Sequence, residues 1–284
     1  MREIKHLVLF LMCGSFVSLA SGETLKDWTL SLIKKNNLRS EDFSFNWVRP
    51  DNTVILQFRS DVLMLPASIS KIVTTSAVLE SIPPGTKFKT QLKSSATIES
   101  GELKGSLYLV GGGDPSFVSE NMWVLVNNFT RTGVKEVKGD ICVDDSLFDS
   151  VRIDDSREGK RVGRAYDAPV GAMSFNWNSM NVFVRPTKNG KLADVTLDPE
   201  NDYLKLENTV KTKKSGVPEL QVDRSWNEKS RQEVVKVRGT IGDGQKEAVI
   251  FANITRPDLW AGANLKAFLK QRGIGVSGSI KNCK

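Results

Sequence analysis

The sequence contains a single histidine, His6, and three cysteines among its 284 residues. His6 follows a basic start at Arg2 and Lys5 and precedes an apolar run at residues 7–17, after which small residues follow. This order predicts an export signal over residues 1–22 that is removed by cleavage. Its apolar part is too short to span a bilayer, so we expect a periplasmic or secreted product without a stable membrane span.

Removal of the leader would also remove the only imidazole. The remaining chain would then exclude a Ser-His-Asp triad, a Cys-His pair and a histidine metal site, so we expect no metal and no other cofactor. An activated serine would need another base, and lysine is the obvious candidate. Cys142 and Cys283 remain as candidates for a disulfide, although the sequence does not show whether their Cα atoms come close enough.

Basic residues exceed acidic ones and give a formal net charge of +7, which permits an acidic partner. However, no stretch interleaves basic residues with stacking aromatics, so we do not expect nucleic-acid binding. Hydrophobic residues make up 39% and charged residues 26% of the chain, as in an ordinary globular protein.

The pattern of apolar residues predicts a mixed fold. Residues 24–36 have helical periodicity, and alternating apolar residues at 43–47 and 54–58 flank a turn, which predicts a hairpin. A second helix follows after Pro66 and stops at Pro83. Short predicted strands with polar turns then dominate, and a helix returns at residues 257–272. We therefore predict the α/β (α+β) class, with helices against an antiparallel sheet.

The stretch Leu65–Lys71 is the strongest candidate for a site. Ser68 is expected in the first turn of a buried helix, where the helix dipole favours an oxyanion. Lys71 follows on the same face one turn later. Burial in the apolar helix would favour the neutral amine that a base requires. The pair therefore predicts a serine nucleophile with a lysine base in reach.

The Ser-x-x-Lys spacing is not specific by itself. A second copy occurs at Ser31–Lys34, and we interpret that copy as the polar edge of an amphipathic helix. For Ser68 the alternative is an N-cap serine followed by a surface lysine. The spacing alone leaves both interpretations open.

Four blocks occur together and in order, and they are far more specific than any one motif. They are Leu65–Lys71, Leu109–Phe117, Gly139–Phe148 and Tyr166–Asn178. With these blocks the chain resembles the class C low-molecular-mass penicillin-binding proteins, the D-Ala-D-Ala carboxypeptidase/endopeptidase family. The resemblance covers nearly all of the chain after the leader.

The resemblance implies a transpeptidase domain, of the kind shared by penicillin-binding proteins and serine β-lactamases, interrupted by a β-rich insert. The first part of that domain would occupy residues 23–87, and the insert residues 88–255. Residues 256–284 would form a return helix toward the transpeptidase domain. We identify no segment that matches the second half of that domain.

The resemblance also implies roles for three residues. Ser68 would be acylated by peptidoglycan stem peptides, and Lys71 would take its proton. Asp144 would contact the amino end of the stem peptide, with a turn aspartate as the alternative. β-Lactams would be covalent inhibitors.

Two later motifs of the family are not found in the expected setting. Family members carry a Ser-x-Asn element and a Lys-Thr-Gly strand in the second half of the domain. Ser174–Asn176 and Lys214–Gly216 imitate them, but we assign the first to the insert and the second to a polar turn. We therefore expect weak or incomplete carboxypeptidase activity. An inactive peptidoglycan-binding pseudoenzyme and a β-lactamase-like hydrolase are the alternatives.

Overall fold

The computed structural model describes residues 24–154 and 163–283. These residues form two compact units that divide after Thr86, and each is considered separately below. The predicted leader at residues 1–22 lies outside the described residues. The assignment of residues 23–87, 88–255 and 256–284 to a transpeptidase domain and its insert stays a prediction.

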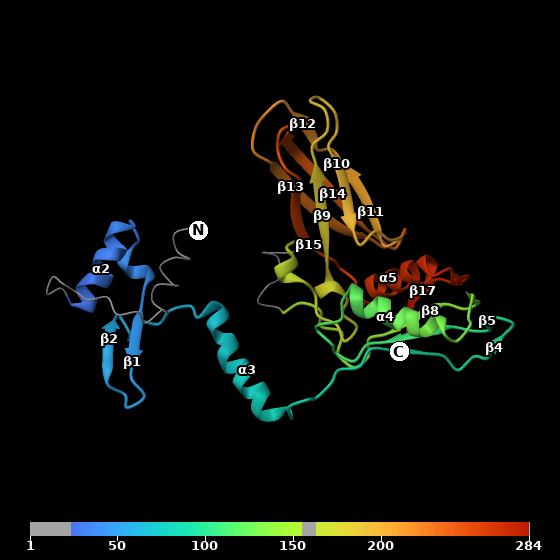
Figure 1. Cartoon of the computed structure of the whole chain (residues 1–284), viewed down its shortest axis with the longest axis horizontal. Coiled ribbons are helices and arrows are strands. Elements are labelled where there is room, and N and C mark those ends of the chain that lie inside the picture. Colours follow the sequence, from blue (N-terminus) through green and yellow to red (C-terminus); the bar gives the residue numbers. More distant parts are fainter. Residues whose placement is uncertain (1–23, 155–162, 284) are drawn as a thin grey trace. The chain divides into compact units, whose positions relative to one another are not determined.

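The described residues of the first unit form two α-helices and a hairpin (Figure 1). Helix α2 (Leu25–Lys35) begins after Thr24, whose hydroxyl oxygen accepts a hydrogen bond from the Asp27 amide. Strands β1 (Phe45–Val48) and β2 (Val54–Phe58) pair antiparallel, as the alternating pattern predicts. A 3₁₀ turn at residues 67–69 leads into helix α3 (Ser70–Ser81).

The first unit has a very small core. Among its described residues, only Thr29, Ile33 and Leu56 are buried. Helix α3 has no buried residue, and Ile72 and Val73 are 67% and 74% exposed. The expectation that Ser68 stands on a buried helix is therefore wrong for this unit. An apolar pattern shows that a helix can pack against a hydrophobic surface, but it does not show that the fold provides such a surface.

The described residues of the second unit form two α-helices and four sheets, and the first two of these sheets are four-stranded and of mixed direction. Helix α4 (Ser119–Thr130) precedes strands that enter both sheets, and helix α5 (Pro257–Gln271) precedes the last strand of each. The strands of the first sheet, in order, are β16 (Gly275–Val276), β7 (Glu136–Val137), β5 (Glu102–Leu103) and β4 (Ile98–Glu99). Those of the second sheet are β17 (Ile280–Asn282), β8 (Ile141–Asp144), β6 (Leu107–Val110) and β3 (Gln91–Lys93).

These two sheets share one pairing scheme. Strand β3 pairs antiparallel with β6, and strand β4 pairs antiparallel with β5. Strands β7, β8, β16 and β17 all add in parallel, after the α4 and α5 crossovers. Parallel pairing requires such crossover connections.

A three-stranded and a four-stranded sheet form the β-rich part between residues 179 and 253. One has the order β10 (Asp194–Asp198), β9 (Ser179–Arg185) and β15 (Ala248–Asn253). In the other, the long strand β14 (Gln232–Gly242) pairs with β11 (Leu204–Asn208), β12 (Lys211–Lys213) and β13 (Glu219–Asn227). Buried residues alternate along β9 and β10, as period-two patterning requires.

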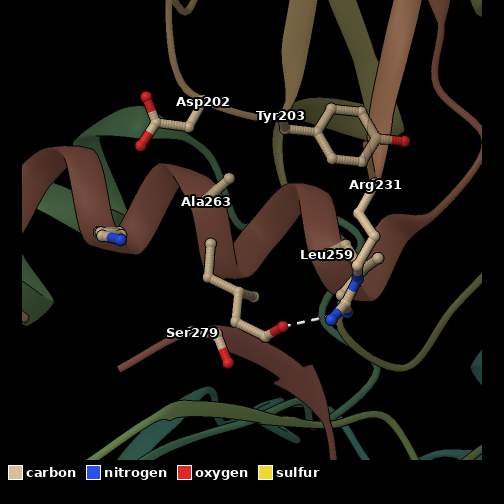
Figure 2. Close-up of a pocket in the computed structure, with 8 residues that line it drawn as sticks. Asp202, Tyr203, Arg231, Leu259, Ala263 and Ser279 are labelled. Carbon is tan, nitrogen blue, oxygen red and sulfur yellow. Dashed lines mark hydrogen bonds between the residues drawn. The ribbon is translucent and has the colours of Figure 1, made fainter. Parts of the chain in front are cut away.

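The main hydrophobic core lies entirely in the second unit. Helix α5 has ten buried residues, among them Trp260, whose indole nitrogen donates to the Phe175 carbonyl at 3.0 Å. The Tyr203 ring lies beside α5 (Figure 2), and its centroid is 5.5 Å from that of Trp260. Helices packed on mixed and antiparallel sheets confirm the predicted α/β (α+β) class.

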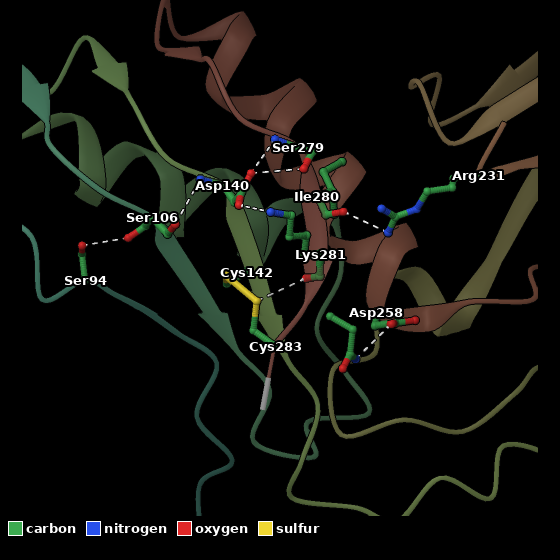
Figure 3. The surroundings of a disulfide bond; sticks show 11 residues. Ser94, Ser106, Asp140, Cys142, Arg231, Asp258, Ser279, Ile280, Lys281 and Cys283 are labelled. Atoms are coloured by element: carbon green, nitrogen blue, oxygen red, sulfur yellow. Dashed lines mark hydrogen bonds and ion pairs between the residues drawn. A yellow bond between two sulfur atoms is a disulfide. The ribbon is translucent and has the colours of Figure 1, made fainter. Parts of the chain in front are cut away.

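A disulfide joins Cys142 of β8 to Cys283, which follows β17 (Figure 3). The two strands are parallel neighbours, and the Cys283 amide donates to the Val143 carbonyl at 2.9 Å. This pairing brings the two Cα atoms to 5.3 Å, within the range that a disulfide needs. The sequence had left this pairing open, and the structure settles it.

No helix among the described residues has both the length and the apolar character needed to cross a membrane.

Candidate active site

The structure brings Ser68 and Lys71 together in the first unit. The Lys71 side-chain nitrogen donates a hydrogen bond to the Ser68 hydroxyl oxygen, with 2.8 Å between Nζ and Oγ. Ser68 lies in the 3₁₀ turn, and Lys71 is the second residue of α3. The spacing of three residues places both side chains on one face. Both side chains are exposed, so a peptide has access to the hydroxyl.

The backbone immediately before Ser68 is strained. Ala67 has a φ of 45°, in the left-handed region that non-glycine residues seldom adopt. Two hydrogen bonds hold this turn. The Ile69 amide donates to the Pro66 carbonyl at 2.9 Å, and the Ser70 hydroxyl donates to the Ala67 carbonyl at 2.7 Å. Strain of this kind persists where the surroundings fix it, and it is common beside functional groups.

The second Ser-x-x-Lys copy has a different geometry. The Ser31 hydroxyl donates to the Trp28 carbonyl at 2.8 Å, within helix α2. Its proton is therefore directed to the backbone, whereas the Ser68 oxygen accepts from a lysine. The same spacing thus gives a helix-surface serine in one place and a serine–lysine pair in the other.

Asp144 lies at the end of β8 in the second unit, so it belongs to a different unit from the serine–lysine pair. Its Oδ1 accepts from the Ser146 amide at 3.0 Å and from the Ser146 hydroxyl at 2.6 Å. These are the contacts of an aspartate that stabilises a turn, which was the alternative interpretation. The role of Asp144 in substrate binding stays a prediction.

The neighbouring Asp145 is a buried acid that the sequence analysis did not single out. Its carboxylate accepts from the Met173 amide at 2.5 Å and forms an ion pair with Arg152. Burial raises the pKa of Asp145, although the Met173 amide and Arg152 oppose that rise. These contacts fasten residues 171–173 to the end of β8. No local pattern distinguishes this buried acid from the exposed one beside it.

The two segments that match later family motifs in sequence, Ser174–Asn176 and Lys214–Gly216, lie in a hydrogen-bonded turn and in a loop. The Ser174 hydroxyl donates to the Gly171 carbonyl at 2.9 Å. The Asn176 side chain accepts from the Ser119 amide at 2.9 Å, at the start of α4. Lys214–Gly216 lies in an exposed connection between β12 and β13. In the described part of the chain, no group of three or more His, Cys, Asp or Glu side chains is arranged to hold a metal ion.

Comparison with known proteins identifies the family. A model of the D-Ala-D-Ala carboxypeptidase 3 (S13) family matches residues 47–284. The chain belongs to this family. The chain is 29% identical to a D-alanyl-D-alanine carboxypeptidase from an Actinomadura species over 225 residues, which are 76% of this chain and 41% of that protein. The predicted membership of the low-molecular-mass penicillin-binding proteins is confirmed.

A second relative links the sequence and the fold. The carboxypeptidase DacB of Haemophilus influenzae is 22% identical over 81% of this chain and 47% of its own length. The crystal structure of penicillin-binding protein 4 (dacB) from that organism matches with a TM-score of 0.64, at 21% identity, over 82% of this chain and 52% of that one. A β-lactam complex of the same protein matches with a TM-score of 0.59, at 19% identity, over 82% of this chain and 49% of that one. These likenesses show a shared fold.

The chain spans less than half the length of these two curated relatives.

Proposed function

We propose that this chain acts as a serine-type D-Ala-D-Ala carboxypeptidase or endopeptidase on peptidoglycan stem peptides, through an acyl-enzyme on Ser68. One observation carries the proposal, the 2.8 Å contact between Lys71 Nζ and Ser68 Oγ in a chain of the S13 family. Two relatives are named D-alanyl-D-alanine carboxypeptidases, and this supports the same substrate class here.

The reaction is an acyl transfer in two steps. Ser68 Oγ attacks the carbonyl carbon of the penultimate D-alanine, or of a cross-link, while the free amine of Lys71 accepts the hydroxyl proton. The C–N bond then breaks, and the proton passes to the amine of the departing residue. Water hydrolyses the resulting ester, which releases the shortened peptide and restores the Ser68 hydroxyl.

The developing oxyanion needs preorganised donors. The Ser68 backbone N–H can serve as one, because amides in a first helical turn have no acceptor within the helix. We place no second donor within the first unit. Since the loss of one oxyanion donor costs roughly 100- to 1,000-fold in rate, we expect slow turnover by the chain alone.

Two further elements of the proposal follow from this chemistry. β-Lactams would act as covalent inhibitors because they offer Ser68 a reactive carbonyl, and one structural neighbour was solved with a β-lactam. A periplasmic or secreted location agrees with the Cys142–Cys283 disulfide, since such bonds persist in oxidising compartments.

The decisive experiment incubates the purified chain with a fluorescent penicillin and maps the labelled peptide by mass spectrometry. We expect one adduct, on Ser68, that the substitution Ser68→Ala abolishes. Ser31→Ala is the matched control, because it removes the serine of the other Ser-x-x-Lys copy and should leave labelling unchanged.

The other outcomes identify the alternatives. Absence of an adduct, with wall-peptide binding unchanged by Ser68→Ala, would replace this proposal with a peptidoglycan-binding pseudoenzyme. An adduct that forms and is released within seconds, with accumulation of hydrolysed β-lactam, would instead identify a β-lactamase-like hydrolase.

A further inference from the structure

A groove follows one side of helix α5 in the second unit. It consists of two adjoining cavities of about 220 and 750 Å³ that share Asp202, Ala263 and Lys266. The smaller cavity also reaches Tyr203 and Arg231 (Figure 2), and the larger one extends past Lys270. The volume of the larger cavity falls within the range of roughly 300–1,000 Å³ that is typical of pockets for small organic ligands.

The spacing of residues on α5 creates the floor of the groove. Ala263, Ala267 and Lys270 follow one another at intervals of three and four residues, so they share one face of the helix with Lys266 beside them. The two alanines leave space above the helix axis because their side chains are short. Lys266 and Lys270 then line this space with two cationic groups.

The opposite wall is the connection between β10 and β11, and it is held firmly. Asn201 donates through Nδ2 to Asn264 Oδ1 on α5 at 3.1 Å, and its Oδ1 accepts from the Tyr203 amide at 3.0 Å. From the other side, Gln232 donates to the Asp202 carbonyl at 3.2 Å. This wall is therefore preorganised, and a ligand need not order it on binding.

The wall carries acidic side chains and the helix carries basic ones. Glu200 and Asp202 line the groove opposite Lys266 and Lys270. Among the described residues, none of these four ionic groups forms an ion pair or a side-chain hydrogen bond. At one end, the Arg231 guanidinium donates to the Ile280 carbonyl at 3.1 Å, which fixes the arginine at the border of the smaller cavity.

We propose that this groove binds a short peptide that carries free carboxylates and a free amine. Its carboxylates would meet Lys266 and Lys270, and its amine would meet the acidic wall at Glu200 and Asp202. A stem peptide of the cell wall has this chemistry, so the groove would hold the wall peptide on the second unit. The identity of the peptide rests on the proposed function, whereas the groove and its charges do not.

The test measures binding of fluorescein-labelled L-Ala-γ-D-Glu-L-Lys-D-Ala-D-Ala, linked through an amino-terminal spacer, by fluorescence anisotropy. The full chain carries Ser68→Ala, so acylation cannot contribute to the signal. We expect the additional pair Lys266→Gln and Lys270→Gln to weaken binding at least about tenfold, as loss of charge-assisted hydrogen bonds predicts. Asp202→Asn should weaken the same peptide severalfold.

Matched controls separate the groove from general charge effects. Lys205→Gln together with Lys213→Gln removes two exposed lysines outside the groove, and this pair should leave the affinity within about twofold. A peptide with amidated carboxylates should bind the parent protein as weakly as the unmodified peptide binds the Lys266/Lys270 variant.

Each failure has a distinct meaning. Equal affinity in the Lys266/Lys270 variant and the Lys205/Lys213 control would overturn the groove proposal, and so would absence of peptide binding by the chain that carries Ser68→Ala alone. Penicillin labelling of Ser68 in the unsubstituted chain could still occur. Conversely, groove-dependent binding without any Ser68 adduct would overturn the proposed acyl transfer and leave the groove in place.

Discussion

The two units of the chain differ in how their key residues are brought together. In the first unit, Ser68 and Lys71 are three residues apart, and one helical turn is enough to join them. In the second unit, the disulfide joins residues 141 positions apart, and the core draws on residues from Leu103 to Ile274. The candidate chemistry is therefore local in sequence, and the packing stability is not.

The helices α3 and α5 make the same contrast. Both contain many apolar residues, but α5 has ten buried positions and α3 has none. Burial of apolar area supplies most of the stability of a folded helix. The second unit should therefore dominate the unfolding free energy, and substitutions in the two helices should differ in their effects.

The largest expected difference compares Trp260→Ala in α5 with Ile72→Ala in α3. Loss of the buried indole should lower the unfolding free energy by about 3–5 kcal/mol, because it leaves a cavity and removes the bond to Phe175. Ile72 is 67% exposed, and its truncation should change stability by less than about 0.5 kcal/mol. Denaturant titration followed by circular dichroism measures both. A large effect at Ile72 would mean that α3 is covered in solution.

The next effect concerns the disulfide. Replacing Cys142 and Cys283 together by serine should destabilise the second unit by about 2–5 kcal/mol, because the unfolded chain regains the freedom of a long loop. Residues 24–86 contain no cysteine, so the first unit should be insensitive to a reducing agent. Limited proteolysis with and without reductant, read by mass spectrometry, tests this. Equal sensitivity of both units to reductant would contradict the contrast.

A smaller effect depends on pH. Burial acts to raise the pKa of Asp258, but two hydrogen bonds from Arg256 and one from Asn282 outweigh it and hold the pKa below its usual range. A depressed carboxyl pKa stabilises the fold above the unfolded pKa of about 3.9, and this stability is lost as the pH falls through the folded pKa. Asp258→Asn should therefore lower stability by about 1–3 kcal/mol at pH 7 and reduce the loss of stability in acid.

The matched variant for this test is Asp42→Asn in the first unit. The side-chain hydrogen bond from Arg39 lowers the pKa of Asp42 as well, but this pair is exposed to solvent. Solvent screens such pairs, so we expect Asp42→Asn to have the same stability as the unsubstituted protein at each pH between 3 and 7. A similar acid response in both variants would show that burial does not separate the two pairs. Urea midpoints measured across this pH range decide the question.

Sequence patterns predicted the local elements well. The periodicity of residues 24–36 and 257–272 placed α2 and α5 to within about two residues, and alternation placed the β1–β2 hairpin. The pairing order of the strands could not be predicted, because β7 and β8 join strands made earlier and later in the chain. Register and neighbours depend on tertiary packing, and a single strand does not specify them.

The serine–lysine pair was predictable because, like the helices and the hairpin, it depends only on residues that are close in sequence. An interval of three residues on a helix is enough to bring Ser68 and Lys71 onto one face. The groove was not predictable, because Asp202 and Lys266 are distant in sequence and meet only through the loop that Asn201 fastens to α5. Burial of α3 was predicted and was wrong, since apolar character alone does not identify a covering surface.

The disulfide has a consequence for biosynthesis. Cys142 has no native partner until residue 283 has been made, so a nascent chain carries an unpaired thiol for 141 residues. The third cysteine, Cys13, lies in the predicted leader and offers a wrong partner until the leader is cut away. Leader removal before oxidation would leave Cys142 and Cys283 as the two cysteines of residues 23–284, so their pairing would have no competitor within this stretch.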